Sequence, residues 1–289
     1  MANSADRQWL SWYEQFDETH GPDKRKEWYS DAALAYRWAR PRYPDVLISR
    51  VLEQASLTKG SRLLEIGCGP GIATESFAAK GMSIVAVEPS AAACDLAKES
   101  CQVYSADVSI INSTFEQYDL ANQRYDAVLA ATCFHWLSPE IACSKPAAAL
   151  KPNGSFILLW ATPPQPSAEI SKYLQPVYER YGLSTLSEGQ QRSQSYYQHN
   201  FELFAQTINE SGFFSSSTVE IETYHSTYSI ERYLALLSTL SPYIEIEDKI
   251  KQNLLADLGD RLSQAVALGS LETTHWFASQ VAPVKNAST

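Results

Sequence analysis

A glycine-rich loop at residues 67–71 constrains the fold of this chain more than any other segment. It follows an apolar run at residues 63–66 and carries three alternating glycines, Gly67, Gly69 and Gly71. Glycine suits a tight turn from strand to helix, because it adopts backbone angles unfavourable to other residues and its missing Cβ lets a ligand lie against the backbone. The pattern therefore predicts a ligand-binding turn after the first strand of an α/β sheet.

The spacing of these glycines separates two classes of nucleotide ligand. A dinucleotide-binding loop, Gly-x-Gly-x-x-Gly, needs its third glycine at position 72, where this chain has Ile72. Glu65 stands beside the loop, where a carboxylate repels the pyrophosphate of NAD and suits the ammonium group of an amino-acid-bearing ligand. We therefore expect S-adenosylmethionine here, bound by Glu65, Gly67, Cys68, Gly69 and Gly71.

A second acidic residue, Glu88, ends the next apolar run and lies 17 positions beyond Gly71. A carboxylate at the end of this strand can accept hydrogen bonds from both hydroxyls of a ribose. Glu88 and the adjacent Pro89 are therefore predicted to contact the cofactor. The alternative is a solvent-exposed carboxylate that caps the helix expected at residues 91–100.

The order of elements predicts an α/β fold with a doubly wound, mostly parallel sheet. Between residues 61 and 160, β-branched runs alternate with alanine-rich stretches, the pattern of parallel strands joined by crossover helices. We expect strands at residues 62–66, 83–87, 108–111, 125–131 and 155–160, and helices at residues 72–80, 91–100 and 138–150. Pro152 and Gly154 predict a turn before the fifth strand.

The regions on either side of this core are expected to form a helical cap. Residues 1–60 look helical and carry nine aromatic residues between Trp9 and Tyr43. Residues 218–228 and 272–281 alternate like strands, with helical stretches before and between them. We divide the chain into an N-terminal helical cap segment (residues 1–60), a cofactor-binding core (residues 61–165) and remaining strands with cap insertions (residues 166–289).

Composition argues against several classes of partner. The net charge of −10 disfavours a nucleic acid, which would be repelled on average. The longest apolar run, residues 156–161, is too short to cross a bilayer. The five cysteines lack zinc-ligand spacing and are read as reduced thiols, so no metal is expected. These features predict a cytoplasmic protein that acts on a small molecule, and they leave its oligomeric state open.

These residues resemble those of the class I S-adenosylmethionine-dependent methyltransferases, in particular the small-molecule branch that includes trans-aconitate methyltransferase. The matching motifs span residues 36–160: Tyr36-x-x-x-Arg40-Pro41, the loop from Glu65 to Gly71, Glu88, Tyr125-Asp126-Ala127-Val128, Phe134-His135-Trp136 and Leu150-Lys151-Pro152-Asn153-Gly154. The resemblance implies a Rossmann-like, seven-stranded sheet whose last strand is antiparallel, with residues 218–228 and 272–281 as strands six and seven.

The resemblance also implies further cofactor contacts. Thr114 stands where many relatives have an aspartate for the adenine amino group, and the neighbouring Phe115 can pack on the adenine ring. Ala131 and Thr132, at the end of the fourth strand, are expected near the methionine part of the cofactor.

Two residues of the N-terminal segment are expected to close over the cofactor by the same resemblance. They are Tyr36 and Arg40, with Arg40 paired to a carboxylate of the cofactor or of the substrate. An alternative role for Arg40 is to fix the turn before Pro41.

The predicted activity is methyl transfer from S-adenosylmethionine to a small-molecule acceptor, with a carboxylic acid as the first expectation from the resemblance. His135 follows the fourth strand at the ligand-binding edge of the sheet and is the candidate general base, although it could equally form the pocket wall. Two other functions stay open at this point: an NAD-dependent oxidoreductase, and a regulator that binds S-adenosylmethionine without turnover.

Overall fold

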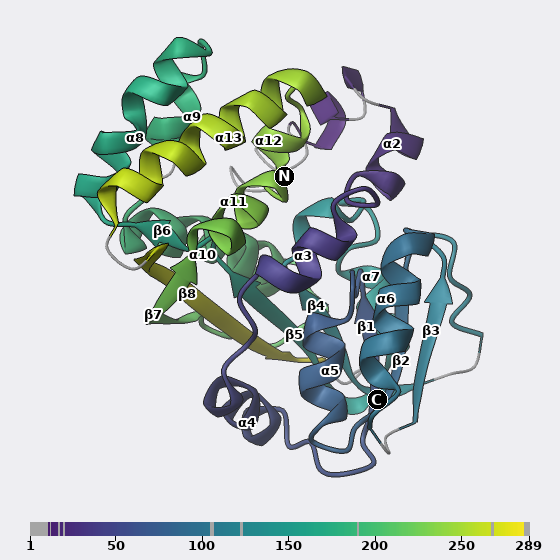
Figure 1. The fold of residues 1–289 in the computed structure, drawn as a ribbon. Helices are drawn as coiled ribbons and strands as arrows, with labels where there is room; N and C mark the ends of the chain where they lie inside the picture. Colours follow the sequence, from purple (N-terminus) through teal and green to yellow (C-terminus); the bar gives the residue numbers. More distant parts are fainter. Residues whose placement is uncertain are drawn as a thin grey trace.

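The computed structural model describes residues 11, 13–16, 18, 19, 21–104, 107–121, 124–189, 191–266 and 269–285. At its centre lies an eight-stranded sheet (Figure 1). Its strands are β1 (Arg62–Ile66), β2 (Ser83–Glu88), β3 (Val108–Asn112), β4 (Tyr125–Ala131), β5 (Leu150–Ala161), β6 (Gln165–Pro166), β7 (Glu220–Ser229) and β8 (Ser270–Pro283). The order across the sheet is β3-β2-β1-β4-β5-β8, and both β6 and β7 pair with β8.

The strand directions confirm the doubly wound α/β fold. Strands β1 to β5 are parallel, and β8 runs antiparallel to β5, β6 and β7. The strands expected at residues 218–228 and 272–281 are β7 and β8. The expected count of seven is one too low, because β8 extends past the end of β5 and its free edge pairs with Gln165 and Pro166. A two-residue strand carries no alternation that a sequence could reveal.

Helices cover both faces of the sheet because its central strands are apolar on both sides. In β1, Leu64 and Ile66 belong to one buried cluster, whereas Leu63 belongs to the other. The first cluster is covered by α7 (Ser144–Ala149) and α10 (Gln194–Glu210), and the second by α4 (Asp45–Gln54), α5 (Ile72–Ala78) and α6 (Ala91–Cys101).

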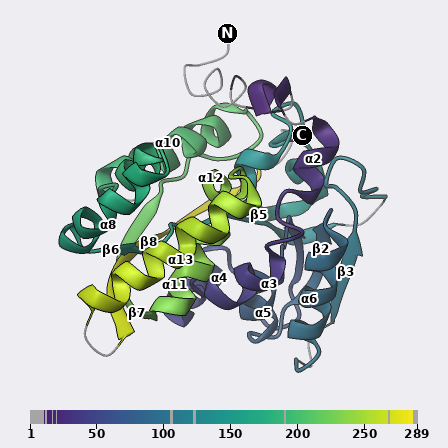
Figure 2. The ribbon, with the colours of Figure 1, turned by 45° about the horizontal axis from the view of Figure 1, so that its top comes forward.

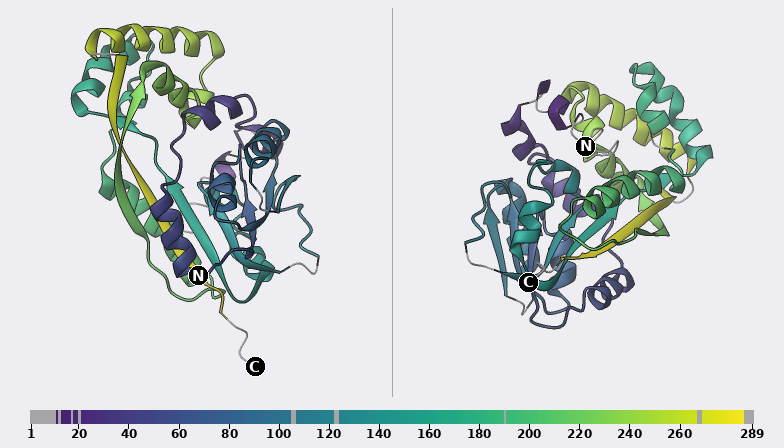
Figure 3. Two further views of the ribbon diagram at one scale, coloured as in Figure 1. Left: turned by 60° about the horizontal axis from the view of Figure 1, so that its bottom comes forward. Right: turned by 180° about the vertical axis from the view of Figure 1, so that it is seen from behind.

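Helices from both flanks form a cap beside the sheet, away from β2 and β3 (Figure 2). The cap contains α3 (Ala33–Ala39), α8 (Ala168–Arg180), α9 (Ser184–Gly189), α11 (Ile230–Ser238), α12 (Ser241–Ile244) and α13 (Asp248–Ala265), which share a third apolar cluster. Tyr228 of β7 and Leu271 of β8 belong to the same cluster. The two long strands therefore join the sheet to the cap (Figure 3).

The helix expected at residues 138–150 begins only at Ser144. An earlier start would place Pro146 in the helix interior, where its ring would clash with the carbonyl group of Ala142. A short 3₁₀ helix at Phe134–Trp136 and a series of turns occupy the residues before α7.

Strand β5 contains a bulge where a turn was expected. Tyr125 of β4 pairs with Leu150 of β5, and Ala127 pairs with Ser155. The segment of β5 between these two pairs is therefore longer than the segment of β4. Asn153, within that segment of β5, has a left-handed backbone with φ of 65°. The Pro and Gly signal marks this irregularity inside the strand, because a bulge and a turn both use such residues.

The N-terminal region contributes to the sheet domain as well as to the cap. Helix α4 packs on the sheet through Leu47 and Val51, while α2 (Pro22–Glu27) and α3 precede it. Trp9 and Trp12 lie outside the described residues. The division into three segments stays a prediction. Within the described ranges, every helix is too short or too polar to span a membrane.

Candidate functional site

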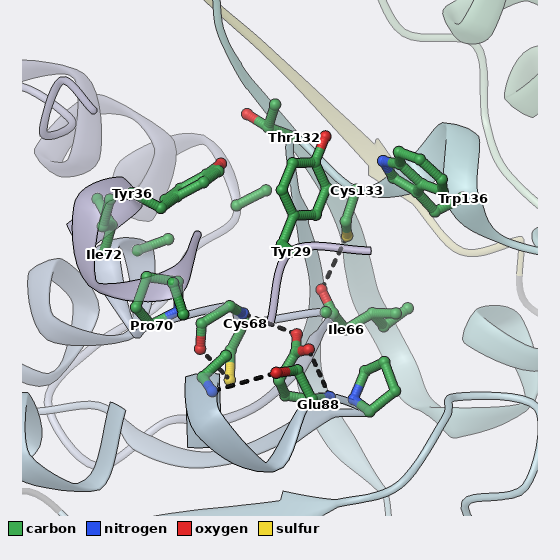
Figure 4. Close-up of a pocket in the computed structure, with 18 of the residues that line it drawn as sticks. Tyr29, Tyr36, Ile66, Cys68, Pro70, Ile72, Glu88, Thr132, Cys133 and Trp136 are labelled. Carbon is green, nitrogen blue, oxygen red and sulfur yellow. Dashed lines mark hydrogen bonds between the residues drawn. The ribbon is translucent and has the colours of Figure 1, made fainter. Parts of the chain in front are cut away.

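A cavity of about 580 Å³ opens at the carboxyl ends of β1, β2 and β4, beneath residues of the cap. The strand order reverses between β2-β1 and β4-β5, which is where open α/β sheets bind their ligands. Figure 4 shows the glycine loop and Glu88 on one side of this cavity, and Tyr29, Tyr36 and Trp136 on the other. Most of the sequence-predicted site residues line it.

The three glycines of the loop have different surroundings, although all have positive φ values of 59°, 53° and 87°. A Cβ on Gly69 would meet no atom within 4 Å, so bare backbone faces open space. A Cβ on Gly67 would lie 3.0 Å from the Cβ of Cys133. A Cβ on Gly71 would lie 3.0 Å from the Cα of Ala97 in α6, and Gly71 does not line the cavity. Gly71 therefore permits helix packing, and Gly67 and Gly69 shape the cavity.

Glu88 is fixed at the end of β2 by two backbone groups. Its Oε2 accepts a hydrogen bond from the Gly69 N–H and its Oε1 accepts one from the Ser90 N–H, both at 2.9 Å. Burial raises the pKa of Glu88, and these two hydrogen bonds oppose the rise. The N-cap of α6 is Ser90, whose Oγ accepts from the Ala93 N–H. Glu88 is thus held toward the cavity, and each of its oxygens keeps a lone pair for a ligand.

Glu65 is the least satisfied polar group of the site. It is 1% exposed, and neither carboxyl oxygen has a hydrogen-bond partner among the described residues. Burial raises its pKa to about 8. The nearby hydroxyl and backbone N–H of Thr74 oppose this rise without forming a hydrogen bond of normal geometry, and the charge of Glu88 adds to the rise. A buried carboxyl group without a partner indicates that a ligand completes it, and a cation is the fitting charge.

The loop after β3 supplies a third part of the cavity wall. Thr114 and Phe115 both line it, together with Glu116. The Thr114 hydroxyl accepts a hydrogen bond from the Gln117 N–H at 3.2 Å, so the hydroxyl stabilises the turn. The predicted adenine residues therefore reach the cavity.

Thr132 has an unusual backbone at the end of β4. Its φ is 57°, a left-handed conformation that strains a β-branched residue. Its hydroxyl accepts a hydrogen bond from the Ala161 N–H at 3.1 Å and lies 2.9 Å from the hydroxyl of Tyr43. Thr132 and Ala131 line the cavity, as does Pro89, which follows Glu88 in the chain.

Tyr36 and Arg40 of the cap line the cavity. Arg40 is 9% exposed, and its Nε and Nη2 donate to the hydroxyl and carbonyl oxygens of Thr239, both at 2.8 Å. Its guanidinium lies 4.6 Å from the ring centroid of Tyr36. In the part of the chain that the structure describes, Arg40 forms no ion pair with a carboxylate. Arg40 thus ties the N-terminal segment to the cap and presents an unpaired positive charge to the cavity.

His135 lies in the cavity wall, stacked on Trp160 with ring centroids 5.8 Å apart. Burial lowers its pKa to about 4. The ring is therefore neutral at pH 7 and a weak base, which fits the wall interpretation better than the general-base interpretation.

Other cavity residues come from parts of the chain whose sequence gave no ligand signal. Tyr29 lies edge-on between Tyr36 and Trp136, with ring centroids 5.7 and 5.8 Å away. The Tyr29 hydroxyl lies 3.0 Å from the hydroxyl of Ser241, at the start of α12. Tyr29 stands among the nine aromatic residues of the N-terminal segment without a motif of its own, and Ser241, 212 positions away, has none either.

Comparison with known proteins points to methyltransferases. Residues 64–158 match the family model for the methyltransferase domain. An uncharacterized methyltransferase of Mycobacterium tuberculosis is 31% identical over 134 residues, covering 46% of this chain and 52% of the relative. An uncharacterized methyltransferase of Schizosaccharomyces pombe is 30% identical over 131 residues, covering 43% of this chain and 49% of the relative. The chain thus spans about half the length of these curated relatives.

Solved structures share the fold at low sequence identity. An Anaeromyxobacter dehalogenans protein assigned as a type II methyltransferase gives a TM-score of 0.58 at 18% identity, covering 84% of this chain and 97% of that one. An Anabaena variabilis protein assigned as a methyltransferase of antibiotic biosynthesis gives a TM-score of 0.52 at 17% identity, covering 82% and 98%. Residues 64–158 thus match a methyltransferase domain in sequence, and the solved structures show that the chain shares the fold of these proteins.

Proposed function

We propose that this protein transfers a methyl group from S-adenosylmethionine to a small-molecule acceptor. The observation that carries the proposal is the buried, unpartnered carboxyl group of Glu65 beside the open backbone of Gly69. An amino-acid-bearing nucleoside would supply the missing cation to Glu65 and would lie against that backbone. The proposal therefore rests on the cofactor end of the cavity.

The remaining residues fit the same cofactor. Glu88 is held where it can accept hydrogen bonds from a ribose, and Thr114 and Phe115 stand at the adenine end. S-adenosylmethionine supplies a methyl group on a sulfonium, a reactive donor for an in-line displacement. Alignment and exclusion of water by the cap can then supply much of the acceleration, so a strong base is unnecessary.

A carboxylic acid is the acceptor class that the opposite side of the cavity favours. Arg40 is buried and anchored to Thr239, yet no carboxylate neutralises it among the described residues. A buried positive charge is costly unless a partner completes it, and a carboxylate is the geometric match for a guanidinium. We therefore place Arg40 with the acceptor. A carboxylate is already an anion at neutral pH, so His135 need not remove a proton.

Calorimetry with S-adenosylhomocysteine and NAD tests the cofactor. Binding of S-adenosylhomocysteine alone is expected, and tighter binding of NAD would favour the oxidoreductase. Incubation with methyl-labelled donor and a cell extract then tests turnover, with Gly69→Val as the control. A protein that binds the cofactor but labels nothing would support the regulator.

The labelled product also reports the acceptor class. Methyl esters of carboxylic acids release labelled methanol in alkali, whereas methyl ethers and N-methyl products do not. Arg40→Met is expected to raise the KM of the acceptor and to leave the Kd of S-adenosylhomocysteine unchanged. An alkali-stable label, or an Arg40→Met defect confined to the cofactor, would contradict the carboxylic acid.

A further inference from the structure

Lys145, which does not line the cavity, holds the loop after β3 in place. Its Nζ donates to the carbonyl oxygens of Phe115, Glu116 and Tyr118, at 2.6, 3.0 and 2.7 Å. An ammonium group has three N–H donors, so all three are engaged by one short stretch of backbone. Lys145 itself is half-buried in the first turn of α7.

The loop from Thr114 to Tyr118 forms a single helical turn, whose last carbonyl groups need a hydrogen-bond donor from elsewhere in the chain. The Tyr118 N–H donates to the Thr114 carbonyl at 3.0 Å, a bond that spans four residues as in an α-helix. The carbonyl groups at the end of an isolated turn have no partner within it and carry partial negative charge. A lysine ammonium group at this end both bonds these carbonyls and complements their dipoles.

The ammonium group of Lys145 bonds backbone carbonyl groups of the loop and no carboxylate among the described residues. Among the described residues, Lys145 forms no ion pair, although Glu116 and Asp119 lie near enough to raise its pKa against the larger lowering effect of burial. Its Nζ also lies 5.0 Å from the ring centroid of Phe115, so the ammonium group and the ring are held together.

We propose that Lys145 is a positioning residue, which sets the adenine end of the cofactor site by fixing the turn from Thr114 to Tyr118. The proposal rests on the proposed function, because it assigns this turn to the adenosyl group. Lys145 cannot reach a ligand with its own donors while it holds the three carbonyls. It acts through Thr114 and Phe115, which do line the cavity.

Lys145→Met tests the proposal, with Lys151→Met as a matched control. Lys151 is a partly buried lysine whose Nζ lies 2.8 Å from the Oδ1 of Asp126, and it does not line the cavity. In calorimetry, Lys145→Met is expected to raise the Kd of S-adenosylhomocysteine about tenfold, the effect of losing a charge-assisted hydrogen bond. Lys151→Met should bind like the wild type, and Lys145→Arg, which keeps the charge and donors, should recover much of the affinity.

Hydrogen exchange of the ligand-free protein measures the anchoring separately. The amides of Gln117 and Tyr118 should exchange faster in Lys145→Met than in the wild type or Lys151→Met. Faster exchange with an unchanged Kd would overturn the proposal, as would unchanged exchange. Failure of the wild type to bind S-adenosylhomocysteine would refute the proposed function instead, and the exchange rates would still report whether Lys145 holds the turn. If Lys145→Met does not fold, Lys145→Gln, which removes the ammonium charge and keeps a polar side chain, provides the same two readouts.

Discussion

Binding of the cofactor should release a proton from Glu65. In the ligand-free protein this carboxyl group has a pKa of about 8, raised from 4.5 by burial, so it is neutral at pH 7. An ammonium group placed beside it would favour the carboxylate and bring the pKa down. Glu65 therefore changes protonation when the cofactor binds, and the affinity depends on pH.

The size of the effect follows from the pKa. At pH 7 a group with a pKa of about 8 is roughly nine-tenths protonated, so binding should release about 0.9 proton. Removing that proton costs about 1.4 kcal/mol at pH 7. The Kd should fall about ninefold from pH 6 to pH 7, about fivefold from pH 7 to pH 8, and little beyond.

The same shift affects the stability of the ligand-free protein. The pKa of Glu65 is higher in the folded protein than in the unfolded chain. The contribution of Glu65 to the free energy of unfolding is therefore fully present below pH 4.5 and is lost as the pH rises through about 8. The ligand-free protein should therefore lose stability across this window, while its affinity for the cofactor increases.

Calorimetry with S-adenosylhomocysteine in two buffers of different ionisation enthalpy counts the released protons. Glu65→Gln provides the control, because the amide does not titrate and should abolish both the proton release and the pH dependence between pH 6 and pH 8. The pKa of Glu88 is also raised by burial, so the variant separates the two carboxyl groups. No proton release in the wild type, or the same release from Glu65→Gln, would refute the reasoning.

Four further predictions concern the loop, the ribose residue and the histidine. Gly69→Val should abolish binding of S-adenosylhomocysteine, because the new side chain enters the open space of the cavity. The protein should still fold but melt at a lower temperature, because a φ of 53° strains a β-branched residue; retained binding in a titration would place the ligand elsewhere. Gly71→Ala should mainly lower the melting temperature, since its Cβ would lie 3.0 Å from the Cα of Ala97 and the backbone costs about 1–2 kcal/mol in addition. Glu88→Gln should weaken binding by about 1–3 kcal/mol, because its NH₂ group cannot accept the N–H that one carboxylate oxygen accepts now; equal affinities in calorimetry would contradict this. His135→Phe should leave the pH profile of kcat unchanged between pH 6 and pH 8, because the pKa of His135 is lowered to about 4; loss of a limb in that range would restore its role as a base.

Sequence reasoning could name most residues at one end of the cavity, the proposed cofactor end, because the signals for them are local in sequence. Glu65, Gly69 and Glu88 each stand at the end of an apolar run, and parallel strands bring such ends to one edge of the sheet. Because β1 and β2 are neighbouring parallel strands, the residues at their carboxyl ends lie next to each other in the sheet. Spacing also distinguished the glycine loop from a dinucleotide site.

Sequence reasoning missed the interactions that join residues far apart in the chain or that involve backbone groups. Arg40 was a candidate ligand for a carboxylate, but its partner Thr239 lies 199 positions away and no periodicity joins the two. Lys145 was unremarkable in sequence, since its acceptors are carbonyl groups that every residue has. Gly71 matched the loop pattern for a reason unrelated to the ligand, because it faces Ala97.

The distribution of charge in the cavity has a consequence for selectivity. The proposed cofactor end holds Glu65 and Glu88, both with raised pKa values. The cap end holds the guanidinium of Arg40, which is hydrogen-bonded to Thr239 and has no carboxylate partner among the described residues. When the cavity is empty, protonation of Glu65 removes one of the two negative charges that the carboxyl groups of Glu65 and Glu88 can carry, so burying the pair costs less than burying two carboxylates would. The full negative charge develops only when a cation arrives. A nucleoside that lacks the amino-acid part, such as methylthioadenosine, would leave Glu65 protonated and gain nothing from it. If the proposed site is right, methylthioadenosine should therefore bind more weakly than S-adenosylhomocysteine, and equal affinities would contradict a role of Glu65 in selecting the donor.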